Sequence, residues 1–165
     1  YQVLFGGSNG EWALMGQSSI SAEQFISPTN QPLQEMDAQF GDSIRLAGVT
    51  FDPPLNELQS GESVTLHLFW QVDQPVAESY TLFLHLWDSA DNQIDQRDVI
   101  PFDGQYPTWA WQVGDVIETT HVLTATEDST APYHLLLGWY RQPSLERLPA
   151  FLNGQPQSDN LIVFP

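Results

Sequence analysis

The sequence contains no cysteine and no lysine among its 165 residues. The lack of cysteine excludes disulfide bonds, thiol catalysis and zinc sites with cysteine ligands. Four arginines oppose 21 acidic residues, so the net charge is -17 at pH 7. Nucleic acids and anionic membrane surfaces would repel such a chain, so neither is expected as a partner. The acidic residues are scattered singly rather than gathered in a tail, which indicates a solvated folded surface.

Long apolar runs and catalytic motifs are also missing. The longest apolar runs, LFLHLW and HLLLGWY, fall short of the roughly 18 residues of a membrane helix, so no membrane span is expected. There is no GxSxG or HExxH motif and no glycine-rich phosphate loop, so we expect no catalytic residues, no cofactor and no enzyme activity. A glycoside hydrolase with paired carboxylates is a distant alternative. The chain begins at Tyr1 without a leader, so we expect a piece of a longer protein or a mature product.

Apolar residues recur with a period of two from Ser43 onward, which is typical of β-strands. In SVTLHLFWQV, for example, alternate residues from Val64 to Val72 are apolar and share one face. Turn-forming clusters of Pro, Gly, Asn and Asp separate the apolar segments. The expected strands cover residues 43–51, 63–72, 80–88, 93–100, 115–123, 132–141 and 161–164. This pattern predicts an all-β fold, an immunoglobulin-like two-layer antiparallel β-sandwich over residues 39–165.

The first 38 residues have a different texture and predict an irregular N-terminal arm. Residues 1–15 could form a hairpin that turns at Asn9 and Gly10. The following segment is rich in Ser, Gln and Pro, and Ser21 and Gln24 have the spacing of a single capped helical turn. We therefore divide the chain into an arm and linker at residues 1–38 and a β-sandwich domain at residues 39–165.

The order of several phrases resembles a known domain family. FGDSIRLAGVTFDPP, GESVTLHLFWQV, YTLFLHLWD, QRDVIPFDGQYPTWAWQVGDVI and APYHLLLGWYR follow one another between residues 40 and 141. The order is similar to that in the extracytoplasmic sandwich domain of some bacterial membrane glycosyltransferase-like proteins of the mannosyltransferase type. The most specific part is the segment with Tyr106, Pro107, Thr108, Trp111, Gly114 and Asp115.

The resemblance implies an accessory domain rather than an enzyme, because the catalytic machinery of those proteins belongs to their membrane portion. It also implies an extracytoplasmic location, periplasmic or on the cell surface, within a larger membrane or envelope protein. Trp109 departs from the resemblance, since a small polar residue is expected at its position. This departure leaves room for an added function.

The stretch QYPTWAW contains the candidate ligand-binding residues. Residues two apart point the same way in an extended chain, so Trp109 and Trp111 are expected on one face. Trp111 is expected to cap the sandwich interior, with its N–H donating to a backbone carbonyl. If Trp109 is exposed beside Tyr106, the pair could stack on a pyranose, with Asp103 and Gln105 bonding to hydroxyl groups. The alternative is that these aromatic residues pack only on one another.

The histidines raise the question of a metal site. His67 falls opposite His85 if residues 73–79 form a simple hairpin loop, and with His134 such a cluster could bind zinc. Successive strands of an immunoglobulin-like sandwich often belong to different sheets, which would separate the first two. We therefore expect half-buried strand histidines and no metal site. His121 lies in a further strand and is not expected to contribute.

One loop is a candidate calcium site. Asp88, Asp91, Asn92 and Asp95 place four oxygen-bearing side chains close together in the sequence. Calcium prefers such oxygens, but the spacing lacks the alternation and the glycine of a calcium-binding loop. A hairpin turn with Asp91 and Asn92 at its tip is the simpler interpretation, and calcium is the alternative.

The combined expectation is a non-catalytic accessory domain of a larger envelope or membrane protein. Its expected partners are a glycan or lipid-linked sugar and the parent membrane protein. A purely structural or protein-interaction module without sugar binding is the alternative.

Overall fold

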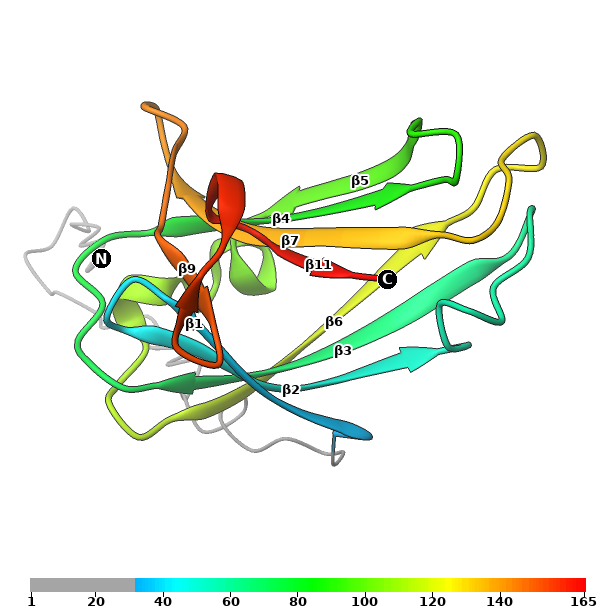
Figure 1. The fold of residues 1–165 in the computed structure, drawn as a ribbon. Coiled ribbons are helices and arrows are strands. Elements are labelled where there is room, and N and C mark those ends of the chain that lie inside the picture. Colours follow the sequence, from blue (N-terminus) through cyan, green and yellow to red (C-terminus); the bar gives the residue numbers. More distant parts are fainter. Residues whose placement is uncertain (1–31) are drawn as a thin grey trace, which may run out of the picture.

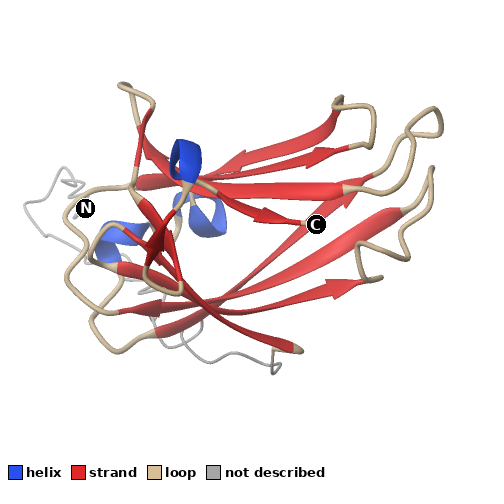
Figure 2. Ribbon diagram, viewed as in Figure 1, coloured by secondary structure: helices blue, strands red, loops and turns tan. Residues whose placement is uncertain are grey.

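The structure is a computed structural model and describes residues 32–165. Two antiparallel sheets pack face to face (Figure 1), and short 3-10 turns are the only helical segments in the described part (Figure 2). The larger sheet has the strand order β10-β9-β1-β2-β3-β6 and the smaller β11-β7-β4-β5, with β8 paired to β7. The strands are β1 (Gln34–Phe40), β2 (Ile44–Asp52), β3 (Ser63–Val72), β4 (Tyr80–Trp87), β5 (Gln93–Val99), β6 (Val116–Thr124), β7 (His134–Arg141), β8 (Glu146–Arg147), β9 (Ala150–Leu152), β10 (Gln155–Pro156) and β11 (Ile162–Phe164).

This architecture confirms the predicted all-β sandwich, and a strand lies in each of the seven segments where one was expected. The chain crosses from the larger to the smaller sheet after β3, returns after β5 and crosses again after β6. As a result β3 pairs with β6 in one sheet, while β4 pairs with β7 in the other. Residues distant in the sequence therefore meet on each face.

The core lies between the sheets and consists of the alternate residues that face inward. Leu66, Leu68 and Trp70 on β3 are fully buried, as is Trp139 on β7 of the opposite sheet. The rings of Trp70 and Trp139 meet edge to face with centroids 4.9 Å apart. Such pairs contribute roughly 0.5–1.5 kcal/mol beyond the burial of their area. The alternate apolar residues predicted from the sequence thus face inward and hold the two sheets together.

Strand β1 differs from the sequence-based expectation. The segment QEMDAQF pairs with β2, and Ala38 and Phe40 are completely buried, so residues 34–38 belong to the sheet rather than to the linker. Met36, Ala38 and Phe40 alternate with polar residues, which is the period-two signal of a strand, but the segment follows directly on the Ser-, Gln- and Pro-rich stretch and is grouped with it in the expected linker. The expected hairpin at residues 1–15 and the expected helical turn lie outside the described residues.

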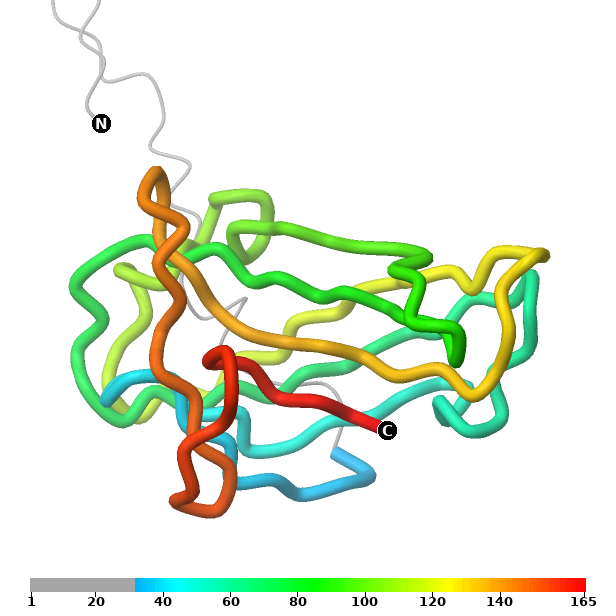
Figure 3. Tube along the Cα trace, turned by 45° about the horizontal axis from the view of Figure 1, so that its top comes forward, coloured from blue at the N-terminus to red at the C-terminus, as the bar shows by residue number. Residues whose placement is uncertain are grey.

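The connections between strands gather at two ends of the sandwich (Figure 3). One end carries the β2–β3, β4–β5 and β6–β7 connections, which span residues 53–62, 88–92 and 125–133. The other end carries the β3–β4 and β5–β6 connections, residues 73–79 and 100–115. Residues 100–115 are here called the candidate loop. This loop contains the candidate ligand-binding residues expected from the sequence.

Candidate functional site

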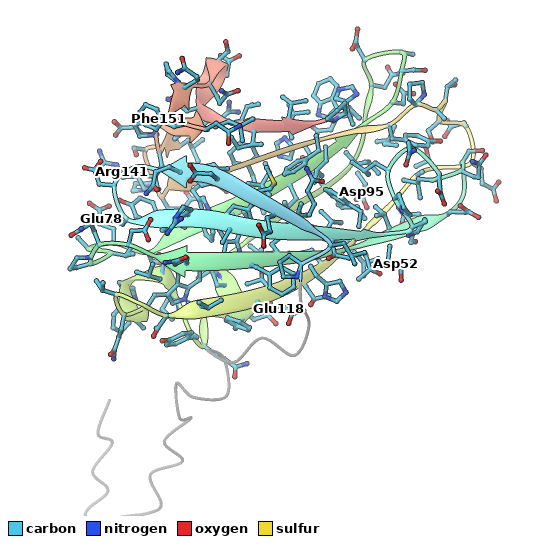
Figure 4. The ribbon with its side chains drawn as sticks, turned by 60° about the horizontal axis from the view of Figure 1, so that its bottom comes forward. Asp52, Glu78, Asp95, Glu118, Arg141 and Phe151 are labelled. Carbon is cyan, nitrogen blue, oxygen red and sulfur yellow. The ribbon has the colours of Figure 1, made fainter. Side chains whose placement is uncertain are left out.

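The candidate loop is held to the sandwich through Thr108. This side chain is fully buried, and its hydroxyl donates to the carbonyl of Glu78 at 2.8 Å. The same hydroxyl accepts a hydrogen bond from the backbone N–H of Tyr80 at 2.9 Å. Glu78, whose carbonyl accepts this bond, also forms an ion pair at 3.5 Å with Arg141 through its side chain (Figure 4). The loop is therefore fixed to the start of β4 by a threonine that uses both its donor and its acceptor.

Tyr106 and Asp115 close the loop on itself. The Tyr106 hydroxyl donates to Oδ2 of Asp115 at 3.0 Å, and the backbone N–H of Gln112 donates to the same oxygen at 2.8 Å. Burial raises the pKa of Tyr106 to about 12, and the hydrogen bond and negative charge of Asp115 add to this shift. Tyr106 is 6% exposed, so it offers no open face to a ligand. The expected platform of Trp109 beside an exposed Tyr106 is not formed.

Trp111 caps the interior as expected from the sequence. It is 3% exposed, and its indole N–H donates to the carbonyl of Tyr106 at 3.0 Å. Its ring meets Trp139 edge to face, with centroids 5.9 Å apart and planes at 90°. The loop thereby gains an aromatic anchor in the main core.

Trp109 points away from the core and is 60% exposed. The expectation that it shares a face with Trp111 is wrong, because Thr108–Ala110 forms the 3-10 turn η3 rather than an extended segment. In a 3-10 turn, residues two apart no longer point the same way. The N–H of Trp111 donates to the carbonyl of Thr108 and closes the turn. A rigid loop thus presents one large aromatic ring to solvent.

The two polar candidates of the loop, Asp103 and Gln105, are both exposed. Asp103 and its neighbour Phe102 have φ angles of 53° and 54°, within the 3-10 segment η2 (Pro101–Gly104). Residues other than glycine that are held in the left-handed region cost of order 1–3 kcal/mol and cluster at functional sites. The strained backbone thus includes Asp103, one of the two exposed polar residues predicted to bind a ligand.

His121, which the sequence analysis set aside, lies below this loop. It lines a cavity of about 260 Å³ together with Phe102 and Asp103. It faces inward from β6, and its Nε2 is buried without a hydrogen-bond partner. Burial, followed by the positive charge of Arg97, lowers the pKa of His121 to about 4. The inward alternation of Ile117, Thr119 and His121 is the sequence signal that could have identified it.

His67 is separated from His85 and His134, as expected from the sequence. His67 lies on β3 and bonds Oε1 of Glu118 at 2.8 Å (Figure 4 labels Glu118), whereas His85 and His134 belong to the smaller sheet. Among the described residues, no group of three or more metal-ligating side chains could hold a metal ion.

The Asp88 loop is a hairpin turn between β4 and β5. Asp88 accepts hydrogen bonds from the backbone N–H groups of Ala90 and Asn92 at 3.0 and 2.9 Å, and from the Asn92 side chain. These bonds, led by the one from the Asn92 backbone, lower the pKa of Asp88. Asp91 takes the left-handed conformation that such a turn tip requires, with φ 60°. The Asp88 carboxylate therefore caps the turn.

These parts define what the loop end can do chemically. An exposed indole on an anchored loop can stack on an apolar ligand face. The exposed carboxylate of Asp103 and amide of Gln105 can exchange hydrogen bonds with hydroxyl groups. No protein-family model matches the chain, and no curated protein matches it either. The similarity to the extracytoplasmic sandwich family thus stays a prediction. In the described part of the chain, no helix is both long and apolar enough to span a bilayer.

Proposed function

We propose that this chain is a non-catalytic accessory domain that contacts glycan through Trp109. The observation that carries the proposal is an indole 60% exposed on a loop in which Tyr106 and Trp111 are buried and hydrogen-bonded. Buried Thr108 and Trp111 hold the backbone on both sides of Trp109, so little backbone ordering entropy is lost when a ligand stacks on the indole. Asp103 and Gln105 supply hydrogen bonds to hydroxyl groups.

A neutral glycan fits the loop better than an anionic ligand. The chain carries a net charge of -17, and such a field repels anions such as nucleic acids and acidic lipids. A sugar offers an apolar ring face together with hydroxyl groups, and it carries no charge to be repelled. Lipid-linked sugars enter the same class through their carbohydrate part.

We further infer that the sandwich is immunoglobulin-like and belongs to a larger extracytoplasmic membrane or envelope protein. The crossings after β3, β5 and β6, with β3 beside β6 and β4 beside β7, support the immunoglobulin-like assignment. The resemblance to the sandwich domains of membrane glycosyltransferase-like proteins supports the placement. In that context the domain would contact glycan while the parent protein performs any chemistry.

A protein-interaction module is the second candidate, and the same loop supplies an observation that favours it. Val113 is 58% exposed, and Ile100 and Val116 are also exposed large apolar residues near the loop ends. Exposed apolar side chains close together often mark protein contacts. This candidate predicts a dependence on Val113 that glycan stacking does not require.

Glycan-array binding of the wild type, Trp109→Ala and Val113→Ala tests the proposal. We expect binding to neutral glycans that Trp109→Ala strongly weakens and Val113→Ala preserves. The fold should survive in both variants, because exposed substitutions usually change stability by about 0.5 kcal/mol or less. Binding to no glycan, or equal binding by wild type and Trp109→Ala, would refute the proposed site.

A further inference from the structure

A second concave site lies on the outer face of the smaller sheet, away from the candidate loop. It has a volume of about 270 Å³ and is lined by residues of β4, β5, β7 and β8. This outer-face hollow is close to the lower end of the roughly 300–1,000 Å³ range of ligand pockets, so it suits one small ring rather than a long ligand. Trp109, Asp103 and Gln105 of the candidate loop do not line it.

Phe83 forms the base of the hollow and is held from both sides. A Cβ atom at Gly138 on the neighbouring strand would lie 2.6 Å from Cζ of Phe83, so glycine is required for the ring to pack there. On the ring, the guanidinium carbon of Arg147 lies 4.8 Å from the centroid. Phe83 is 2% exposed as a result. The ring therefore serves as a support for the arginine, not as a face for a ligand.

Arg147 is fixed by a second contact. Its Nη1 donates to the carbonyl oxygen of Asp159 at 2.9 Å. Residue 147 also pairs with Tyr140 across the β7–β8 ladder. A guanidinium held on an aromatic ring and a carbonyl loses little freedom when its remaining N–H groups bind a ligand. The hollow thus contains a preorganised donor.

The opposite wall supplies hydrogen-bond acceptors and a phenol. Asp98 on β5 pairs with Phe83 in the ladder, and its Oδ2 lies 3.7 Å from Nε2 of His85. Tyr140 packs against Phe83 with ring centroids 6.3 Å apart. Burial raises the pKa of Tyr140, and the negative charge of Asp98 adds to the shift. The hydroxyl of Tyr140 is therefore a protonated neighbour of a carboxylate.

Leu145 contributes an apolar surface to the lining of the hollow. It is 62% exposed and has a φ angle of 59°, which is unusual for a bulky residue. Its backbone N–H donates to the carbonyl of Arg141 at 2.9 Å, which holds the turn. An exposed leucine in a strained conformation beside a polar hollow is an outlier of the kind that accompanies binding sites.

We propose that the outer-face hollow binds one neutral pyranose unit, with Arg147 donating to its hydroxyl groups and Asp98 accepting from them. The pyranose ring would pack against the side chains of Leu145 and Tyr140. A carboxylated sugar is disfavoured because Asp98 lies in the hollow and the chain is strongly acidic. Gln96, which also lines the hollow, can donate and accept further hydrogen bonds. This site goes beyond the proposed function, since it does not involve Trp109.

An NMR titration with small probes tests this site. The probes are methyl β-D-glucopyranoside, methyl α-D-mannopyranoside and sodium glucuronate at millimolar concentrations, and the signals followed are the Arg147 Nε–H and the Gln96 side-chain amide. We expect saturable shifts with at least one neutral pyranoside and none with glucuronate. Asp98→Asn and Arg147→Gln should each weaken binding about tenfold, the scale expected for hydrogen bonds to charged groups.

Two control variants separate this site from the candidate loop. Trp109→Ala and the distant exposed variant Glu57→Gln should leave the titration unchanged. No shift with either neutral pyranoside, an equal response to glucuronate, or full binding by both hollow variants would overturn the proposal. Loss of the shifts in Trp109→Ala would also overturn it, because binding would then belong to the loop. If Arg147→Gln fails to fold, Asp98→Asn alone carries the test.

Discussion

The candidate loop and the outer-face hollow use their aromatic rings in opposite ways. In the loop, Trp109 is exposed while Tyr106 and Trp111 are buried as its supports. In the hollow, Phe83 is covered by Arg147, and polar groups from different strands meet around it. The loop therefore offers a stacking face with few fixed polar partners, whereas the hollow offers fixed polar partners with little aromatic face.

This difference indicates two kinds of recognition. A lone exposed ring accepts any ligand with an apolar face, so the loop should be tolerant in what it binds. A hollow with a fixed guanidinium and a carboxylate depends on the position of each hydroxyl group, so it should be selective. The same sandwich can present both because the loop lies at one end and the hollow on the flat side of the smaller sheet.

The largest expected effect separates the two tryptophans of the loop. Trp111→Ala should lower the free energy of unfolding by about 3–5 kcal/mol, because a buried ring and its hydrogen bond are lost from the core. Trp109→Ala should change it by about 0.5 kcal/mol or less. Urea denaturation of both variants measures this contrast. Equal losses of stability in the two variants would contradict the assignment of Trp111 to the core and of Trp109 to the exposed ligand-contacting surface.

The second effect is a loss of stability in acid caused by His121, which lines the cavity next to the candidate loop. The folded pKa of His121 is lowered to about 4 from 6.5, so the unfolded chain binds a proton that the folded chain rejects between these values. Stability should therefore be fully present above pH 6.5 and fall towards pH 4, by roughly 3 kcal/mol at most. His121→Leu should flatten this part of the pH dependence measured by urea denaturation. An unchanged slope would show that His121 is not the group responsible.

The third effect separates the hollow from the loop. Gly138→Ala places a Cβ atom against Phe83 and should cost about 1–3 kcal/mol. It should also abolish binding of neutral pyranosides to the hollow while leaving Trp109-dependent glycan binding intact. Gly138→Ala combined with Phe83→Leu should regain part of the lost stability because the smaller side chain relieves the clash. No rescue would argue against the close approach as the cause.

The smallest effect probes how the loop is closed. Tyr106→Phe removes the hydrogen bond to Asp115 and should cost about 0.5–1.5 kcal/mol at neutral pH. The folded pKa of Tyr106 is raised to about 12, so its contribution is present below pH 10 and is lost as the pH rises towards 12. Alkaline denaturation should therefore be less steep in the variant. Identical alkaline profiles would contradict this assignment.

The sequence predicted the sandwich well because its strands obey a strict period of two with clear turn signals. It also predicted the core position of Trp111 and the separation of His67 from His85. The prediction that Trp109 shares a face with Trp111 is wrong, because the turn Thr108–Ala110 replaces the extended chain on which that prediction depended. The platform that required an exposed Tyr106 is not formed, because Tyr106 is buried. Residue spacing alone does not reveal such a local change of period.

The hollow was not predicted because its parts are far apart in the sequence. Phe83, Asp98 and Arg147 come from three strands whose pairing is fixed only by the crossings of the chain between sheets. Gly138 within an apolar strand was the one local signal, since a glycine there indicates a close approach of another group. This glycine indicates that another group approaches closely at position 138, but it does not indicate which residue does so.

The most direct test of the account is a calorimetric titration of the wild type, Trp109→Ala and Arg147→Gln with the strongest glycan from the array. The account predicts binding that Trp109→Ala weakens at least about tenfold and that Arg147→Gln leaves within about twofold of wild type. Equal affinity of wild type and Trp109→Ala would contradict the central claim that an exposed tryptophan on an anchored loop makes this sandwich a glycan-contacting domain.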